Sequence, residues 1–209
     1  MKFLDESCDF RQLTSELLSQ SAVFDCGKQS LNIFYQTESI AYTSDLMGKT
    51  YCFTLSADPE VIVCAFTIAN DSIKMSHLPN ARKKKVNKYV ARGKHKNSYP
   101  SVLIGRLGVN KDFHGQNIGP ELMDFIKAWF IDSNNKTGCR FIVVDAYNEE
   151  VPLKYYVKCG FDFLIPDEIA ELKYTKNILE EENEIAENGT LHTRLMFFDL
   201  IRLRTVIID

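Results

Sequence analysis

One stretch constrains the fold of this chain more than any other: VLIGRLGVNKDFHGQNIG at positions 102–119. Its apolar half predicts a buried strand, and its polar, glycine-bearing half predicts a tight turn that leads into a helix with Pro120 in its first turn. A strand that ends in such a loop directs unpaired N–H groups and the positive end of the helix dipole toward an anion. Two glycines alone can match by chance, so the segments that follow must decide between an anion site and an ordinary strand–helix joint.

The next segments predict a helix and a second buried strand. The helix has its apolar residues at helical spacing, with Trp129 expected in the core: Leu122, Phe125, Ile126, Trp129 and Phe130. The run RFIVVDA at 140–146 is continuously apolar between its Arg and its Asp, as in a strand covered on both faces. Strand, helix and strand form a right-handed βαβ unit with parallel strands, whose ligands bind at the carboxyl ends of the strands. We therefore expect the loop 114–119 and the residues after Ala146 at one site.

The remaining segments predict further elements on both sides of this unit. Helical spacing occurs over residues 5–20 and 29–42, and Asp25 is placed to cap the second of these helices. Other patterns predict a hairpin of strands 50–55 and 61–69, helices over 148–158 and 167–178, and strands over 161–164 and 191–200.

Length, N-terminus and cysteines bound the class of protein. At 209 residues and 45% hydrophobic content, one domain with a real core is expected. No run of about 18 apolar residues occurs, so we expect no membrane span. Acidic residues stand where a signal peptide needs apolar ones, so we expect a cytoplasmic protein. The cysteines lack any CxxC pair, so we expect reduced thiols and no zinc or other metal site: Cys8, Cys26, Cys52, Cys64, Cys139 and Cys159.

Positive charge is concentrated in one segment. Residues 82–96 carry eight cations and no acid, so the rest of the chain has a net charge of −11 within a total of −3. A phosphate-rich partner would bind such a segment, because each neutralised phosphate releases counterions. A solvated surface loop is the other interpretation. The residues that would contact RNA are Arg82, Lys83, Lys84, Lys85, Lys88 and Arg92.

The order of these motifs resembles the GNAT superfamily of acyl-CoA N-acyltransferases. HGQNIG at 114–119 aligns with the family's Arg/Gln-x-x-Gly-x-Gly/Ala loop, and YYVKCGF at 155–161 with its Tyr-x-x-x-Gly-Phe helix end. The segment FDCG at 24–27 and the basic segment before IGRL resemble one subgroup, the tRNA-acetylating toxins of toxin–antitoxin modules. The resemblance covers about residues 20–200. It implies a single N-acetyltransferase domain over residues 1–209, with an acidic linker at about 179–189.

The resemblance also implies the architecture and the cosubstrate. The fold class is α/β (α+β), a GNAT-like fold with a mixed, mostly antiparallel sheet of about six or seven strands, a central βαβ unit and flanking helices. The cosubstrate is acetyl-CoA (coenzyme A). Two residues depart from the family loop, Asn117 in place of Gly and His114 in place of Arg or Gln. Asn tolerates a left-handed backbone best among non-Gly residues, so the turn can persist, and His114 can donate to phosphate or simply face solvent.

The resemblance assigns roles residue by residue. The backbone of Leu107, Gly108 and Val109 would bind the pantetheine and acetyl carbonyl and supply an oxyanion hole. The loop His114, Gly115, Gln116, Asn117, Ile118 and Gly119 would hold the pyrophosphate, and Asn148 would hydrogen-bond the CoA arm. Tyr156, four residues before Gly160, would be the general acid for the leaving thiolate, because a phenol is protonated at neutral pH.

The acceptor and the partners stay open at this stage. The subgroup implies the amino group of aminoacyl-tRNA, a cognate antitoxin and a homodimer. A small amine, or a protein Lys or N-terminus, is a second acceptor class, and the acidic remainder of the chain is compatible with it. A non-catalytic acyl-CoA-binding regulator is a third hypothesis, motivated by Asn117 and His114. No residue stands out as the general base.

Overall fold

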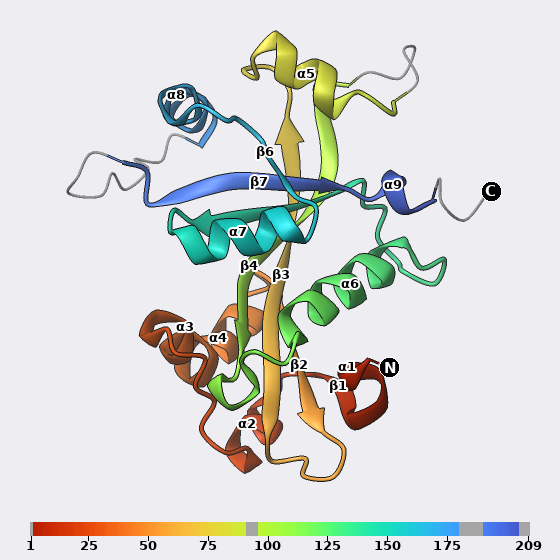
Figure 1. Cartoon of the computed structure of the whole chain (residues 1–209), viewed down its shortest axis with the longest axis vertical. Helices are drawn as coiled ribbons and strands as arrows, with labels where there is room; N and C mark the ends of the chain where they lie inside the picture. The colour runs from red at the N-terminus through yellow and green to blue at the C-terminus, as the bar shows by residue number, and fades with distance from the viewer. Residues whose placement is uncertain (1, 91–95, 180–189, 205–209) are drawn as a thin grey trace. The chain divides into compact units, whose positions relative to one another are not determined.

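The computed structural model describes residues 2–90, 96–179 and 190–204 (Figure 1). Its helices are α1 (Phe3–Ser7), α2 (Ser15–Gln20), α3 (Gln29–Ile33), α4 (Ser39–Ser44), α5 (Asn80–Val86), α6 (Ile118–Ile131), α7 (Glu150–Lys158), α8 (Glu168–Leu179) and α9 (Ile201–Arg204), with a π-helical turn η1 (Phe34–Glu38) and a 3-10 turn η3 (Lys111–Phe113). Its strands are β1 (Cys8–Gln12), β2 (Lys49–Leu55), β3 (Ile62–Lys74), β4 (Ser98–Val109), β5 (Phe141–Tyr147), β6 (Asp162–Phe163) and β7 (Thr193–Asp199).

The seven strands form one sheet in the order β1-β2-β3-β4-β5-β7-β6. The pairings of β1 with β2, β2 with β3, β5 with β7, and β6 with β7 are antiparallel. The Arg140 N–H, just before β5, donates to the Pro100 carbonyl near the start of β4. The two strands therefore start side by side, as parallel strands joined by a crossover helix do. The prediction of a mixed, mostly antiparallel sheet with a central βαβ unit is confirmed.

The chain divides into two compact units. The first comprises Met1–Ala69 and Ile104–Ile126, and the second comprises Asn70–Leu103 and Lys127–Asp209. β3 and β4 each begin in one unit and end in the other. Among the described residues, no helix combines the length and the apolar character of a membrane span.

In the first unit, the predicted helix over residues 5–20 is wrong, because a strand interrupts it. β1 pairs with β2 from Cys8 to Gln12, and the Phe10 ring lies 5.4 Å from Tyr51 and 4.7 Å from Phe125. This pairing and packing override the local helical spacing. Both ends of the predicted segment are helical, in α1 and α2, and α2 begins after Thr14, whose side chain accepts the Leu17 N–H at 3.2 Å.

The helix predicted over residues 29–42 is confirmed, with one irregular turn. α3 and α4 are joined through η1, where the backbone widens to π geometry at Phe34. Phe34 and Tyr35 are buried there, and the Tyr35 hydroxyl donates to the Ala65 carbonyl on β3 at 3.0 Å. The widened turn thus anchors this helical segment to the sheet of the first unit.

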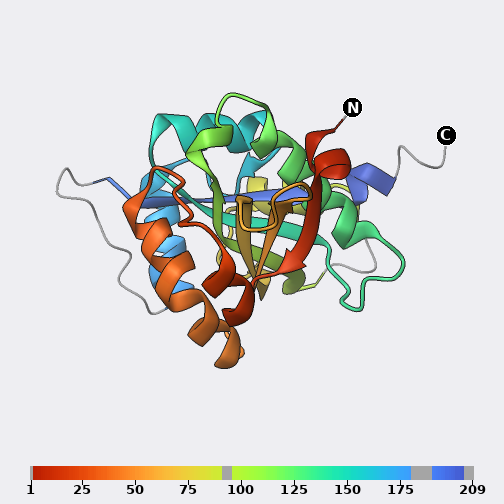
Figure 2. The ribbon, with the colours of Figure 1, turned by 90° about the horizontal axis from the view of Figure 1, so that it is seen from below.

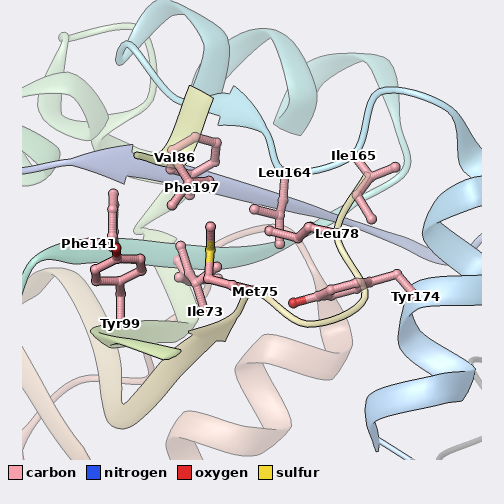
Figure 3. Close-up of a cluster of buried hydrophobic side chains, with 11 residues drawn as sticks. Ile73, Met75, Leu78, Val86, Tyr99, Phe141, Leu164, Ile165, Tyr174 and Phe197 are labelled. Atoms are coloured by element: carbon pink, nitrogen blue, oxygen red, sulfur yellow. The ribbon is translucent and has the colours of Figure 1, made fainter. Parts of the chain in front are cut away.

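In the second unit, a cluster of buried apolar side chains connects the strands with the helices α5 and α8 (Figure 3). Val86 of α5 is fully buried, and Tyr174 of α8 donates its hydroxyl to the Lys74 carbonyl at 2.9 Å. The cluster comprises Ile73, Met75, Leu78, Val86, Tyr99, Phe141, Val143, Leu164, Ile165, Tyr174 and Phe197. Trp129, expected in the core, is half-buried, with its ring centroid 5.4 Å from that of Phe130.

Candidate functional site

The last half of β4 is closely packed against the FDCG segment of the first unit. A Cβ added to Gly108 would lie 3.1 Å from the Cys26 Cβ and 3.4 Å from the Tyr35 ring. The distance to Cys26 is tighter than side chains normally accept, whereas the distance to Tyr35 is ordinary van der Waals contact, so a residue with a Cβ at this position would require Cys26 to move slightly. The strand ends at Val109, and the side-chain amide of the next residue, Asn110, donates to the Ile62 carbonyl at 3.0 Å. Gly108 and Asn110 therefore fix the strand segment that the resemblance assigns to the acetyl group.

The loop after β4 has the backbone geometry of an anion-binding turn. Figure 2 shows the chain passing from β4 through this loop into α6. Gly115 and Asn117 both adopt left-handed backbone angles, with φ of +78° and +64°. The prediction that Asn117 can preserve the turn is confirmed. The first buried residue of α6 is Ile118, so the loop ends at the N-terminus of a 14-residue helix, where the dipole is positive.

His114 is exposed, and its Nε2 lies 2.8 Å from the Val109 carbonyl oxygen. With the ring proton on Nε2, His114 donates to this carbonyl, and Nδ1 is left as a hydrogen-bond acceptor. The Gln116 side-chain amide donates back to the Asp112 carbonyl at 3.2 Å. Both side chains therefore bind the backbone of the loop itself and help to hold its shape.

The residue Asp25 does not cap the helix after it, and that prediction is wrong. Residue Lys28 occupies the N-cap of α3, with no side-chain cap. The Asp25 carboxylate instead accepts hydrogen bonds from the Gly27 N–H at 2.9 Å and the Asn32 amide at 2.7 Å, and it pairs with Lys111 at 2.8 Å. The hydrogen bond from Lys111, followed by those from Gly27 and Asn32, holds the Asp25 pKa well below its usual value. This network, Asp25–Asn32–Lys111, ties the FDCG segment to the loop after β4.

Cys26 lies beside Gly108 and is held as a neutral thiol. Its N–H and its Sγ both point to the Asn32 Oδ1, at 2.9 and 3.2 Å, and burial raises the pKa of the thiol. All six cysteines carry free thiols, as expected. Burial raises the pKa of Cys8 and Cys139 to about 11 and that of Cys52 to about 12. A thiol with such a pKa is a poor nucleophile at neutral pH, which favours the interpretation of these residues as core packing.

In the second unit, the YYVKCGF segment forms a Schellman motif at the end of α7. Gly160 has φ of +83° and donates to the Val157 carbonyl, and the Phe161 N–H donates to the Tyr156 carbonyl. The Phe161 and Tyr156 rings pack at 5.4 Å, as the motif requires of its apolar pair. The spacing Tyr-x-x-x-Gly-Phe thus has a physical cause: Tyr, Gly and Phe occupy three fixed positions of one helix end.

Tyr156 is held in a poorly solvated position. Burial, followed by the neighbouring Cys159 and Asp145, raises the pKa of Tyr156 well above its usual value. The hydroxyl therefore stays protonated across the physiological pH range.

Asn148 lies between β5 and α7, where its N–H donates to the His192 carbonyl. Its side-chain amide donates to the Leu191 carbonyl at 2.9 Å and reaches Glu168 at 3.4 Å. These bonds fix the direction of the side chain. Its assignment to the CoA arm stays a prediction.

The basic segment is partly committed to the protein itself. Arg82 donates to the Leu164 carbonyl at 2.7 Å and to the Phe163 carbonyl, and Lys85 pairs with Asp162. Lys83 donates to the Ser76 carbonyl at 3.1 Å. Three of the six predicted RNA contacts therefore fasten α5 to its neighbours.

Two predicted contacts remain exposed on α5 and the turn after it. Lys84 and Lys88 are exposed, and the Lys88 ammonium lies 4.9 Å from the centroid of the exposed Tyr89 ring. Arg92 and the predicted acidic linker after residue 179 lie outside the described residues.

One functional candidate was not predicted from the sequence, the buried Lys127. It lies in α6, four residues after Met123 and three before Phe130, both of which are buried. A lysine on the apolar stripe of an amphipathic helix was the signal available in the sequence, because charged residues are almost never buried without a partner.

No family model matches this chain. Solved toxin structures do match it over nearly its whole length. AtaT complexed with acetyl-methionyl-tRNAfMet is 18% identical, with a TM-score of 0.63, and covers 96% of this chain and 99% of its own. A Tyr-to-Phe mutant of KacT is 16% identical, with a TM-score of 0.63 and the same coverage of 96% and 99%.

A third structure contains a Tyr-to-Phe mutant of the AtaT toxin bound to the C-terminus of the antitoxin AtaR and acetyl-CoA. It is 17% identical, with a TM-score of 0.57, and covers 98% of this chain and 100% of its own. Identities this low bear on the fold alone. The chain therefore has the fold of the AtaT toxin and of KacT, and the fold implied by the sequence resemblance is confirmed.

Proposed function

We propose that this protein is an acetyl-CoA-dependent N-acetyltransferase, folded as a single domain over residues 1–209. The observation that carries the proposal is the left-handed backbone at Gly115 and Asn117, directly before the N-terminus of α6. Such a loop suits a pyrophosphate, whose oxygens accept from backbone N–H groups at the positive end of the helix. The shared fold of AtaT, solved with acetyl-CoA, supports the choice of cosubstrate. The continuity of β3 and β4 through both units supports one domain.

Several groups of the chain would each contribute to the transfer of the acetyl group. Acetyl-CoA supplies a thioester whose sulfur can leave as a thiolate. The backbone of Leu107, Gly108 and Val109 would orient the acetyl carbonyl and stabilise the oxyanion, while residues His114 to Gly119 hold the pyrophosphate. Gly108 is suited to this because its missing Cβ leaves the FDCG segment packed closely behind the strand.

Tyr156 would donate a proton to the leaving thiolate. Its raised pKa keeps the hydroxyl protonated at the pH of the cell, so the donor form is always present. Asn148 would bind the CoA arm through its side chain, which the bond to Leu191 holds in one orientation.

For the acceptor, we propose the amino group of aminoacyl-tRNA, which would place the reaction in the cytoplasm. The exposed cations Lys84 and Lys88 support an RNA acceptor, and the neighbouring Tyr89 ring offers a surface on which a base can stack. AtaT has been solved with acetyl-methionyl-tRNAfMet and with its antitoxin AtaR. We also propose that this protein binds a cognate antitoxin and forms a homodimer.

Two other functions are compatible with parts of the sequence. The net charge of −11 outside residues 82–96 favours a cationic acceptor, a small amine or a protein Lys or N-terminus. A non-catalytic regulator would need a degraded loop, and the left-handed Asn117 argues against degradation.

One assay separates the three functions. Release of CoA thiol from acetyl-CoA is measured with purified protein and three acceptors: bulk aminoacylated tRNA, uncharged tRNA and a panel of polyamines and peptides. We expect turnover with charged tRNA alone and a loss of roughly 10²–10⁴-fold in rate for Tyr156→Phe. Turnover with amines or peptides instead would replace the acceptor, and acetyl-CoA binding without turnover on any acceptor would favour the regulator.

A further inference from the structure

Lys127 is a buried cation directed at the end of α7. Its side chain is 6% exposed, and its Nζ donates to the Cys159 carbonyl oxygen at 2.6 Å. The same ammonium lies 4.3 Å from the centroid of the Phe198 ring, a cation–π distance. Cys159 is the C-cap of α7, so the bond is made to one of the last carbonyls of that helix.

A second cation binds the next carbonyl. Arg202 of α9 donates to the Gly160 carbonyl at 3.0 Å, and its guanidinium lies 4.9 Å from the centroid of the same Phe198 ring. Gly160 leaves little free space there, because a Cβ at this position would meet the Phe198 ring at 3.3 Å. Phe198, which is buried, therefore contacts both cations and the glycine of the Schellman motif.

These contacts complete the end of the helix. The Schellman motif uses the carbonyls of Tyr156 and Val157, and the two cations bind those of Cys159 and Gly160. Positive groups are also favoured there by the negative end of the helix dipole. A methionine at position 127 would fill similar volume without the cost of burying a charge, but it would remove the hydrogen bond to the Cys159 carbonyl.

We infer that Lys127 and Arg202 are positioning residues for Tyr156. By binding the carbonyls of Cys159 and Gly160, they fix the last turn of α7, in which Tyr156 lies. This inference rests on the proposed role of Tyr156 as the proton donor. It assigns to the two cations the orientation of the phenol and no contact with acetyl-CoA. A small displacement of a catalytic group lowers the rate of the chemical step far more than it lowers cosubstrate binding.

The test is a double-mutant cycle between Lys127→Met and Tyr156→Phe, followed by CoA-thiol release with the acceptor that supports turnover. The Tyr156→Phe background is measured at high enzyme concentration so that its residual rate is quantified. In the wild-type background, Lys127→Met is expected to lower kcat roughly tenfold and to leave KM for acetyl-CoA within about twofold. In the Tyr156→Phe background, the same change is expected to alter kcat by less than about twofold.

Matched variants cover the other outcomes. Lys154→Met is the control, because Lys154 is an exposed lysine on the same helix as Tyr156, paired with Glu150, and its loss is expected to leave kcat unchanged. Arg202→Met, at an exposed position, is combined with Tyr156→Phe in a second double-mutant cycle. This cycle tests the inference if Lys127→Met fails to fold. An equal loss of kcat in both backgrounds would mean a general effect on folding and would overturn the inference. If Lys127→Met is fully active and Tyr156→Phe has a reduced kcat, the positioning role of Lys127 is wrong and the proposed role of Tyr156 stands. If Tyr156→Phe is fully active, the proposed role of Tyr156 is wrong.

Discussion

At the scale of single residues, two backbone positions carry the proposed cosubstrate site. Gly108 allows β4 to approach Cys26, and Asn117 adopts a left-handed backbone of φ +64° without being glycine. Both follow from elementary sterics: a Cβ at the first position would crowd Cys26, and the second position tolerates a Cβ because Asn is the least penalised non-Gly residue there. Gly105, in the same strand, has open space around it and carries no such constraint.

Replacement of Gly108 by alanine tests the first position. The added Cβ would lie 3.1 Å from the Cys26 Cβ, so the strand or the FDCG segment must move. We expect Gly108→Ala to lower the free energy of unfolding by about 1–3 kcal/mol. Gly105→Ala is the matched control and should change it by less than about 0.5 kcal/mol. Urea denaturation of the three proteins measures both values, and equal values for the two variants would contradict the steric argument.

At the scale of elements, the network Asp25–Asn32–Lys111 joins two loops that are far apart in sequence. The folded state lowers the Asp25 pKa, so the carboxylate contributes stability above its unfolded pKa of about 4 and loses it as the pH falls. The side chains of Asp25 and Lys111 are 36% and 58% exposed, so solvent screens the pair. The pair therefore adds little to the free energy of unfolding, and its main effect is to fix the position of the loop after β4.

The substitution Asp25→Asn should accordingly make the free energy of unfolding less dependent on pH in the acidic range. Between pH 6 and pH 3 the wild-type protein is expected to lose more free energy of unfolding than the variant, because the unfolded wild-type chain binds a proton at Asp25 in this range while the folded protein keeps Asp25 ionised. At pH 6 the variant should be the less stable of the two. Urea denaturation at both pH values measures the difference, with Asp58→Asn, at an exposed position of the β2–β3 turn, as the control. A variant with the same acid dependence as the wild type would show that the network does not hold in solution.

The elements also show what the sequence can predict. The central βαβ unit and the hairpin of β2 and β3 were predictable because their apolar patterns are long and their turn residues are specific. β1 was not, because its five residues take their conformation from pairing with β2. The partner of Asp25 was also missed, because Lys111 is distant in sequence and local spacing suggested a helix cap. The end of α7 was predicted as a motif, but its two cations come from α6 and α9.

At the scale of the whole molecule, charge is distributed unevenly. Residues 82–96 hold eight cations, and the remainder of the chain has a net charge of −11. Arg82 and Lys83 bind backbone carbonyls and keep their charge, Lys85 is paired with Asp162, and Lys84 and Lys88 are exposed to a partner.

Neutralising these two lysines should weaken RNA binding without disturbing the fold. For the pair Lys84→Ala and Lys88→Ala, we expect a lower affinity for charged tRNA and a slope of log K against log salt reduced by about 2. Arg82→Ala should instead lower the thermal midpoint, because the Leu164 carbonyl loses its donor. Fluorescence titrations at several salt concentrations measure the slope, with the exposed Lys136→Ala as the control. An unchanged slope would exclude these lysines as phosphate contacts.

The course of β3 and β4 has a consequence for how the chain can be inherited and cut. Each strand starts in one unit and finishes in the other, so a fragment encoding either unit would lack half of two neighbouring strands and expose their unpaired edges. Exchange of one unit by recombination would therefore interrupt both strands. We expect changes of acceptor to arise by substitution and by variation of loops, which leave the shared strands intact.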